Sequence, residues 1–375
     1  MRIVVVAETF LPAVNGVTHS VEKLLEHFAL RGDEVLVIAP AAGGPPGPVP
    51  AAARVVLLPS VPLARYASVR IAVGGVARIR RILADFAPDL VHLASPFELG
   101  WRAARAAEQL GLPVIAVYQT DIPGYAARYG VPFLENWAWQ RVENIHGGAA
   151  RTLAPSSSAV AQLQDRGIPR VRLWRRGVDT RRFHPSRRST TLRAGIAPDG
   201  ALLIGYVGRL AAEKQVEDLR ALAGIDNTRL VIIGDGPQRP VLEAMLPDAA
   251  FLGFLGGDAL AAAMASLDLF VHPGELETFC QTIQEAMASG VPVVATARGG
   301  PVDLVDNSRT GWLYEPGNLA DLRRHVEDLA GDDVKRAAFS AAAFAGVQGR
   351  TWPVLCELLV QHYEEAINDH ALLHL

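Results

Sequence analysis

The chain has 375 residues, of which 50% are hydrophobic and 20% are charged, and this composition excludes a disordered protein. Its length is more than one ordinary core fills, and it predicts two domains of about 150–200 residues each. No apolar run approaches the ~18–20 residues that cross a bilayer, and two cysteines are too few for a disulfide scaffold or a zinc site, so we expect a cytoplasmic protein.

Charge is unevenly distributed along the chain. Residues 1–178 hold 19 Lys and Arg against 13 Asp and Glu, a net charge of +6, whereas the remainder holds 17 against 26, a net charge of −9. This asymmetry predicts that the first half meets an anionic surface, although an uneven spread over two solvated surfaces is the alternative. Because the whole chain is not basic, we expect no nucleic-acid partner.

The first half alternates short β-branched runs with helical patterns. We interpret residues 3–7 as a strand rather than a signal peptide, because Glu8 interrupts the apolar run. A helix is expected over 17–31, and Gly32 ends it. The Pro/Gly-rich stretch 43–50 and the run 57–59 are expected to bracket a loop and a minor strand. The further strands expected in this half are 34–39, 90–94, 114–118, 152–154 and 171–174.

The pattern restarts after a linker over 180–200, which is rich in Arg, Ser, Pro and Gly. Strands are expected at 202–207, 230–233, 250–252, 267–271 and 293–295, and a last helix at 351–368. Alternation of this kind predicts an α/β fold with two Rossmann-like parallel sheets facing a central cleft. We expect domains at 1–178 and 179–349, with 350–375 crossing back to the first domain. Ligands of such sheets bind beyond the carboxyl ends of the strands.

Two glutamates flank the start of an expected helix in the second half. Thr278 and Gln281 have capping-box spacing, so the helix is expected to begin at Thr278. Glu277 then lies just before free amides that favour a phosphate, where it can accept hydrogen bonds from sugar hydroxyls. Glu285, two turns into the helix, can reach another part of the ligand, such as a ribose. The alternative is two helix-surface carboxylates.

Two cations follow the first strand of the second half. Arg209 comes directly after Gly208, and Lys214 follows five residues later. Together they suit a diphosphate, since Arg offers a bidentate clamp and Lys a point charge. The alternative, two exposed basic residues at a helix start, conflicts with the helix dipole and with the rarity of lysine in this chain.

Weaker signals lie in the first half. Gly16, in an Asn-Gly turn before a helix, permits close approach of a phosphate, but such turns are common. Gln119 and Asp121 follow a strand and point to the same site, although polar residues there are more often loop caps. The segment 63–86 could form an amphipathic basic surface for anionic lipid, or a solvated helix packed by its apolar side. Its arginines are Arg65, Arg70, Arg78, Arg80 and Arg81.

No metal-binding tripeptide DxD occurs, and neither HExxH nor GxSxG is present. The histidines show no ligand spacing. We therefore expect no metal and no cofactor.

Taken together, these segments resemble the family 4 retaining glycosyltransferases of the GT-B fold over nearly the whole chain. Glu277 through Glu285 matches the family's Glu-x7-Glu signature, and Gly208-Arg209-Leu210 with Lys214 matches its diphosphate clamp. The residues Phe10–Val17 match the N-terminal glycine loop, and the turn that begins at Gly234 matches the nucleotide-side turn. All four occur in the family's order.

A narrower likeness is to actinobacterial GDP-mannose-dependent α-mannosyltransferases, which build membrane glycolipids, phosphatidylinositol mannosides and lipomannan. It rests on residues 277–281, 118–121 and 92–96. Cys280 replaces the usual glycine of the broad family, and Gln119 replaces a histidine that touches the donor sugar, and both departures fit the narrower group.

The resemblance implies metal-independent transfer of mannose from GDP-mannose to a lipid-linked acceptor at the inner face of the membrane, with retention. Arg209, Lys214 and Glu277 are implied as catalytic residues. In this scheme the acceptor attacks from the front face, and the leaving phosphate takes its proton. The residues implied to bind the donor are Gly16, Gln119, Asp121, Gly208, Arg209, Lys214, Gly234, Glu277, Phe279, Cys280, Gln281 and Glu285.

Three alternatives remain open at this point. A UDP-sugar donor, UDP-glucose or UDP-N-acetylglucosamine, would use the same chemistry. An epimerase would need an acid/base pair that the sequence does not reveal. A non-catalytic nucleotide-sugar-binding protein would have no need to keep Arg209, Lys214, Glu277 and Glu285 together.

Overall fold

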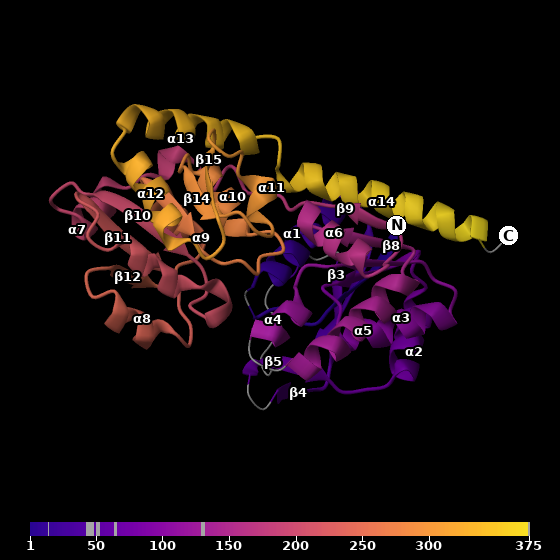
Figure 1. The fold of residues 1–375 in the computed structure, drawn as a ribbon. Coiled ribbons are helices and arrows are strands. Elements are labelled where there is room, and N and C mark those ends of the chain that lie inside the picture. The colour runs from indigo at the N-terminus through magenta and orange to yellow at the C-terminus, as the bar shows by residue number, and fades with distance from the viewer. Residues whose placement is uncertain (14, 43–48, 50–52, 64–65, 129–131, 374–375) are drawn as a thin grey trace. The chain divides into compact units, whose positions relative to one another are not determined.

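The computed structural model describes all residues except 14, 43–48, 50–52, 64–65, 129–131 and 374–375. The described chain forms two compact units. Unit 1 contains Met1–Arg176 and Pro353–Leu375, and unit 2 contains Gly177–Trp352. The boundaries expected from sequence were 178 and 349. Each unit is built around a parallel sheet with helices packed on it (Figure 1).

Unit 1 contains a seven-stranded sheet in the order β3-β2-β1-β6-β7-β8-β9, and every pairing in it is parallel. Its strands are β1 (Arg2–Ala7), β2 (Glu34–Pro40), β3 (Ala53–Leu58), β6 (Leu90–Ala94), β7 (Val114–Val117), β8 (Arg151–Ala154) and β9 (Val171–Leu173). Its helices are α1 (Gly16–Arg31), α2 (Val76–Phe86), α3 (Glu98–Gln109), α4 (Ile122–Arg128), α5 (Pro132–Gly148), α6 (Ser157–Asp165) and α14 (Trp352–Leu373, in this unit from Pro353).

The core of unit 1 follows from the alternation of its strands. Val4 and Val6 of β1 pack in one buried cluster with Ile79 of α2 and Ala103 of α3. Helix α14 is joined to unit 1 by polar contacts as well: the Tyr363 hydroxyl lies 2.7 Å from Nδ1 of the buried His92. Its Leu355 carbonyl accepts a hydrogen bond of 2.8 Å from the indole N–H of Trp174.

The segment 63–86 is not one helix, and that expectation was wrong. The antiparallel strands β4 (Ser60–Leu63) and β5 (Tyr66–Ala72) form a hairpin, and only the second half of the segment forms helix α2. The β-branched Val69 and Ile71 of β5 favour extended backbone. Helix α2 buries Ile79, Leu83 and Phe86.

Unit 2 contains a six-stranded sheet in the order β12-β11-β10-β13-β14-β15, again parallel throughout. Its strands are β10 (Leu202–Val207), β11 (Thr228–Ile233), β12 (Ala250–Gly253), β13 (Leu269–His272), β14 (Val293–Thr296) and β15 (Gly311–Tyr314). Its α-helices are α7 (Thr190–Ile196), α8 (Arg239–Met245), α9 (Gly257–Ala265), α10 (Gln281–Ala288), α11 (Pro301–Leu304), α12 (Leu319–Ala330) and α13 (Asp333–Val347). Three 3-10 turns accompany them: η1 (Pro185–Arg187), η2 (Ala212–Lys214) and η3 (Val216–Leu222).

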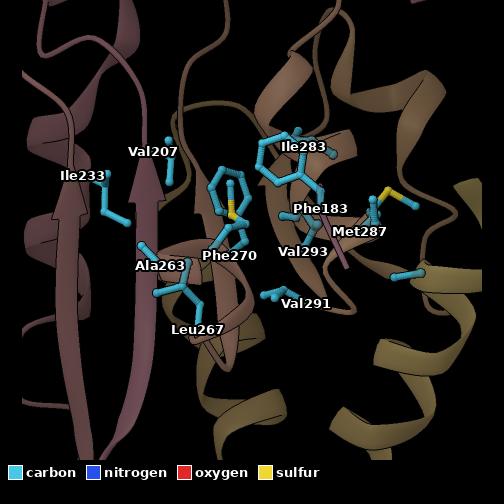
Figure 2. Close-up of a cluster of buried hydrophobic side chains, with 14 of the residues drawn as sticks. Phe183, Val207, Ile233, Ala263, Leu267, Phe270, Ile283, Met287, Val291 and Val293 are labelled. Carbon is cyan, nitrogen blue, oxygen red and sulfur yellow. The ribbon is translucent and has the colours of Figure 1, made fainter. Parts of the chain in front are cut away.

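Two hydrophobic clusters cover the two faces of this sheet. Figure 2 shows one of them, in which Val207, Phe270 and Val293 of the strands lie with Ile283 and Met287 of α10. The other cluster takes the alternate strand residues, such as Tyr206 and Val271, and packs them against Leu322 of α12. Helix α10 is therefore held against the sheet, so its N-terminus has a fixed position.

Among the described residues, none of the helices is both long enough and apolar enough to span a membrane.

Candidate active site

Strand order in unit 2 defines where a ligand is expected. The chain runs from β10 outward through β11 and β12, and then returns to β13 on the other side of β10. Ligands of such sheets bind beyond the carboxyl ends of the strands at this switch point. The segments that follow β10 and β13 carry the two motifs of the sequence analysis, Gly208–Lys214 and Glu277–Glu285.

The structure brings Lys214 and Glu277 into direct contact. Nζ of Lys214 lies 2.5 Å from Oε1 of Glu277, and both side chains are largely buried. Gln215 holds the same two segments together, since its amide oxygen accepts the backbone N–H of Glu275 at 2.9 Å and its amide nitrogen donates to the Glu275 carboxylate at 3.3 Å. Lys214 and Glu277, 63 residues apart in sequence, are thus held in contact by specific bonds between their segments.

The pair keeps the Glu277 carboxylate ionised. Burial alone would raise its pKa, but the Lys214 ammonium and the hydrogen bond from His272 outweigh burial and lower the pKa from 4.5 to about 2. Glu277 is therefore an anion at neutral pH, and its charge is already balanced by a cation that we expect to contact the diphosphate.

His272, the last residue of β13, is a member of the site that the sequence analysis missed. Its Nε2 lies 3.2 Å from Oε1 of Glu277, and the Gly274 N–H donates to its Nδ1 at 3.2 Å. Burial lowers the pKa of His272, whereas contacts with Cys280 and Glu277 raise it, but the Gly274 N–H donates to Nδ1 and this geometry requires a neutral ring. Because a proton on Nδ1 would break the Gly274 contact, we assign the proton facing Glu277 to Nε2. In the sequence, His272 is a single histidine at the end of a strand, and rules based on motif spacing do not select such a residue.

Helix α10 begins three residues later than expected, so the prediction of a Thr278 cap was wrong. The helix starts at Gln281, and its N-cap is Cys280, which is left-handed with φ 73° and makes no side-chain capping bond. Phe279 and Cys280 are buried, and the Gln281 side chain donates to the Gly177 carbonyl at 3.0 Å. Because the Cys280 side chain makes no capping bond, it does not occupy the amides that an anion would bind.

Glu285 consequently lies one turn into α10 rather than two. Its side chain is buried on that helix. No described contact tests its expected role at a ribose, which stays a prediction.

Arg209 is only partly available as a clamp. Its guanidinium forms an ion pair with the fully buried carboxylate of Glu213, a residue that the sequence analysis did not select. More than half of the Arg209 side chain remains exposed, so the guanidinium can still meet a phosphate. The two cations of the motif are thus each placed by a buried glutamate.

Gly234 is explained by backbone packing. Its φ is +145°, and a Cβ there would lie 1.9 Å from the carbonyl oxygen of Gly208. The turn after β11 therefore lies directly on the turn after β10, and this close approach needs glycine whether or not a nucleotide binds.

In unit 1, Gly16 and Gln119 meet at Arg176. The Arg176 guanidinium donates to the Gln119 side-chain oxygen, and a Cβ on Gly16 would lie 2.9 Å from Nη1 of Arg176. Arg176 and Gln119 are both buried. Arg176 was passed over because it lies in a basic run near the domain boundary.

Asp121 acts locally as a loop cap. Its carboxylate accepts hydrogen bonds from the Tyr118 hydroxyl at 2.9 Å and from the Gly124 N–H at 3.0 Å. A further 3.3 Å contact comes from the Gln162 amide. Its contact with a donor stays a prediction.

The arginines expected on one basic helix are divided. Arg78, Arg80 and Arg81 are exposed on α2. Arg70 belongs to β5 and donates to Ser60 through Nε and Nη2, at 2.7 and 3.0 Å. Arg65 lies outside the described residues.

Within the described residues, one group of side chains is close enough together to hold a metal ion. The ligand atoms of His272, Glu277 and Cys280 lie within 4.8 Å of one another.

Solved structures of glycosyltransferases share this fold. Sucrose-phosphate synthase from Thermosynechococcus elongatus matches 97% of this chain and 98% of its own, with a TM-score of 0.83 and 20% identity. Anabaena Alr3699/HepE in complex with UDP matches 97% of this chain and 100% of its own, with a TM-score of 0.79 and 19% identity. The fold is that of the GT-B glycosyltransferases.

Sequence comparisons define the family. The family model for Glycosyltransferase Family 4 matches residues 14–182, and the model for Glycosyl transferases group 1 matches residues 189–345. A GDP-mannose-dependent alpha-mannosyltransferase of Mycolicibacterium smegmatis is 48% identical over 99% of both chains. One from Corynebacterium glutamicum is 45% identical over 98% of this chain and 89% of its own. The chain belongs to the retaining family 4 glycosyltransferases.

Proposed function

We propose that this chain transfers mannose from GDP-mannose to a lipid-linked acceptor, with retention of configuration and without a metal. The donor is the one in the names of relatives that are 45% and 48% identical over nearly the whole chain. A relative that is 27% identical over 81% of this chain is named as a GDP-mannose-dependent phosphatidylinositol dimannoside mannosyltransferase. These likenesses support a glycolipid acceptor.

The observation that carries the proposal is the Lys214–Glu277 pair beside the N-terminus of α10. Transfer generates charge on the leaving diphosphate, and fixed cations and amides lower the energy of that state. Lys214, Arg209 and the first amides of α10 all belong to unit 2 and follow the two strands at its switch point. The proposal assigns them the diphosphate, with Glu277 on the sugar side.

Each side chain has a distinct part in this scheme. Lys214 supplies a positive charge whose position Glu277 fixes, and Arg209 adds a second charge that is fixed by Glu213. The leaving phosphate oxygen accepts the acceptor's proton on the same face that mannose leaves, which gives retention. Gly16 and Gln119 of unit 1 stay predicted donor contacts.

The test is mannose transfer with labelled GDP-mannose, UDP-glucose and UDP-N-acetylglucosamine, each with and without EDTA. We expect turnover with GDP-mannose alone, an α-configured product and no loss of rate in EDTA, because cationic side chains neutralise the diphosphate. Turnover with a UDP-sugar instead would overturn the donor. Loss of activity in EDTA with rescue by magnesium would overturn the metal-free scheme. Tight GDP-mannose binding without any turnover would favour the non-catalytic alternative.

Peripheral attachment to an anionic membrane is the second part of the proposal. Its support is the net charge of +6 on residues 1–178 and the exposure of Arg78, Arg80 and Arg81 on one short helix. Because Ile79, Leu83 and Phe86 of α2 are buried in unit 1, the attraction is expected to be electrostatic rather than insertive.

Replacing Arg78, Arg80 and Arg81 with serine is expected to weaken binding to vesicles that contain phosphatidylglycerol. At about 1 kcal/mol for each arginine near the surface, the three together correspond to about a hundredfold in affinity. Binding of wild-type protein should also fall as salt rises. Vesicle sedimentation over a salt series measures both effects, and GDP binding should not change.

A matched control removes the same charge elsewhere. Arg220, Arg309 and Arg324 are exposed in unit 2, and their replacement with serine should leave vesicle binding close to that of the wild type. Equal losses in the two triple variants would show that only net charge matters. Equal binding of wild type to neutral and anionic vesicles would remove the membrane part of the proposal.

A further inference from the structure

Three side chains of different chemistry converge at the end of β13. His272 ends the strand, Glu277 lies in the following loop, and Cys280 is the N-cap of α10. Their ligand atoms all lie within 4.8 Å of one another. Nε2 of His272 and Oε1 of Glu277 are 3.2 Å apart, close to the ~3.3–3.6 Å that separates neighbouring ligands around a tetrahedral zinc ion.

The donor set selects a class of cation. One imidazole nitrogen, one thiolate sulfur and one carboxylate oxygen form the mixed set that zinc accepts. Magnesium and calcium take oxygen ligands, and only one of these three groups offers oxygen. His272 and Cys280 are both more than nine-tenths buried, so the ligands come from packed positions rather than from mobile surface chains.

Two contacts compete with a metal ion at this site, so we expect the ion to bind reversibly rather than to be permanently present. Lys214 lies 2.5 Å from the same carboxylate oxygen, so a cation must displace its ammonium. A metal on Nε2 of His272 also moves the ring proton to Nδ1, where the Gly274 N–H now donates. Both changes cost free energy, so the ion is expected to leave when a chelator is added.

We propose that His272, Glu277 and Cys280 bind a zinc ion that separates Lys214 from Glu277 and thereby inhibits the enzyme. Binding releases the thiol proton of Cys280 to solvent and leaves the fourth coordination position to water. The inhibition rests on the proposed function, because it requires Lys214 to hold the donor diphosphate, whereas zinc binding itself does not.

The experiment titrates the full chain, first treated with EDTA and dialysed, with zinc in competition with a chromophoric chelator. Cobalt replaces zinc in a parallel titration, where a near-ultraviolet charge-transfer band reports a thiolate ligand. We expect one ion per chain, and Cys280→Ser should bind zinc at least about tenfold more weakly and lose the cobalt band. Lys214→Met should bind zinc more tightly than wild type, since the competing ammonium is gone.

Matched controls use the chain's other cysteine and another lysine. Cys356 is buried in α14, where burial raises the pKa of its thiol to about 12, so Cys356→Ser should leave both titrations unchanged. Lys335→Met should also have no effect on zinc. Because Cys280 has φ 73°, Cys280→Gly removes the thiol at a position that glycine adopts without strain, and it guards against misfolding of the serine variant.

The outcomes separate this proposal from the function itself. Zinc affinity equal to wild type in both Cys280 variants, or no gain in Lys214→Met, would overturn the zinc site. Competition between zinc and GDP is the expected result. Zinc binding that GDP leaves unchanged, with the variant effects intact, would sustain the zinc site and instead overturn the placement of the diphosphate at Lys214.

Discussion

Replacing Lys214 with methionine is expected to destabilise unit 2 and to remove most of its affinity for GDP. Breaking a buried ion pair from one side costs about 3–5 kcal/mol, and we expect the lower end because His272 still donates to Glu277. Loss of a charged contact to phosphate costs about 1.5–3 kcal/mol, or about tenfold to a hundredfold in GDP affinity. Urea unfolding and isothermal titration measure the two effects.

A double variant separates stability from binding. Lys214→Met with Glu277→Gln leaves no unpaired buried charge, so stability should largely recover while GDP affinity stays low. Lys335→Met is the matched control, because Lys335 pairs with Asp328 on the surface at 2.6 Å and its loss should change neither quantity appreciably. GDP affinity like that of the wild type in Lys214→Met would show that this lysine does not clamp the diphosphate.

The same pair sets how stability depends on pH. The folded-state pKa of Glu277 is about 2, below its ordinary 4.5. A lowered pKa stabilises the fold above pH 4.5, and this contribution disappears as the pH falls towards 2. The shift corresponds to about 3 kcal/mol, and Lys214→Met should lose less over this window because its Glu277 pKa is higher.

Regular elements were predictable where local pattern and burial agree. Strand β10 lies at 202–207, as its β-branched and aromatic residues predicted, and Gly32 ends α1 with φ +77°. Strand β15 at Gly311–Tyr314 was missed, because a four-residue strand in which only the two end residues are buried carries little periodicity. Strand β5 was missed because Arg70 and the apolar residues around it also fit a helical pattern.

The site was predictable as a set of residues but not as a set of contacts. The segments of Lys214 and Glu277 were both expected beyond the carboxyl ends of strands, but the ion pair between them depends on side-chain packing that no spacing rule encodes. The start of α10 was misplaced because Cys280 adopts a left-handed conformation, which is rare for residues other than glycine. His272 and Glu213 were missed because they act through Glu277 and Arg209 rather than through a motif of their own.

The two glutamates of the signature are expected to respond differently to neutralisation. Glu277→Gln should lower the rate of mannose transfer tenfold or more, because it removes a charge-assisted contact on the sugar side. Its effect on GDP affinity should be smaller than its effect on rate, since GDP has no sugar and Lys214 keeps its charge although Glu277 no longer fixes its position. Glu285→Gln should weaken GDP and GDP-mannose by similar factors, because both ligands carry the ribose that Glu285 is proposed to contact.

Isothermal titration of both ligands against both variants, with steady-state rates, decides between the two roles. Glu327→Gln is the control, since Glu327 pairs with Arg323 at the surface of α12, at 2.7 Å, and its loss should alter neither ligand. The two roles predict different patterns. In Glu277→Gln the loss of rate should exceed the loss of GDP affinity, whereas in Glu285→Gln the two losses should match. If Glu277→Gln weakens GDP as strongly as Glu285→Gln does, Glu277 contacts the nucleotide rather than the sugar, and the Lys214–Glu277 pair serves only to hold the diphosphate.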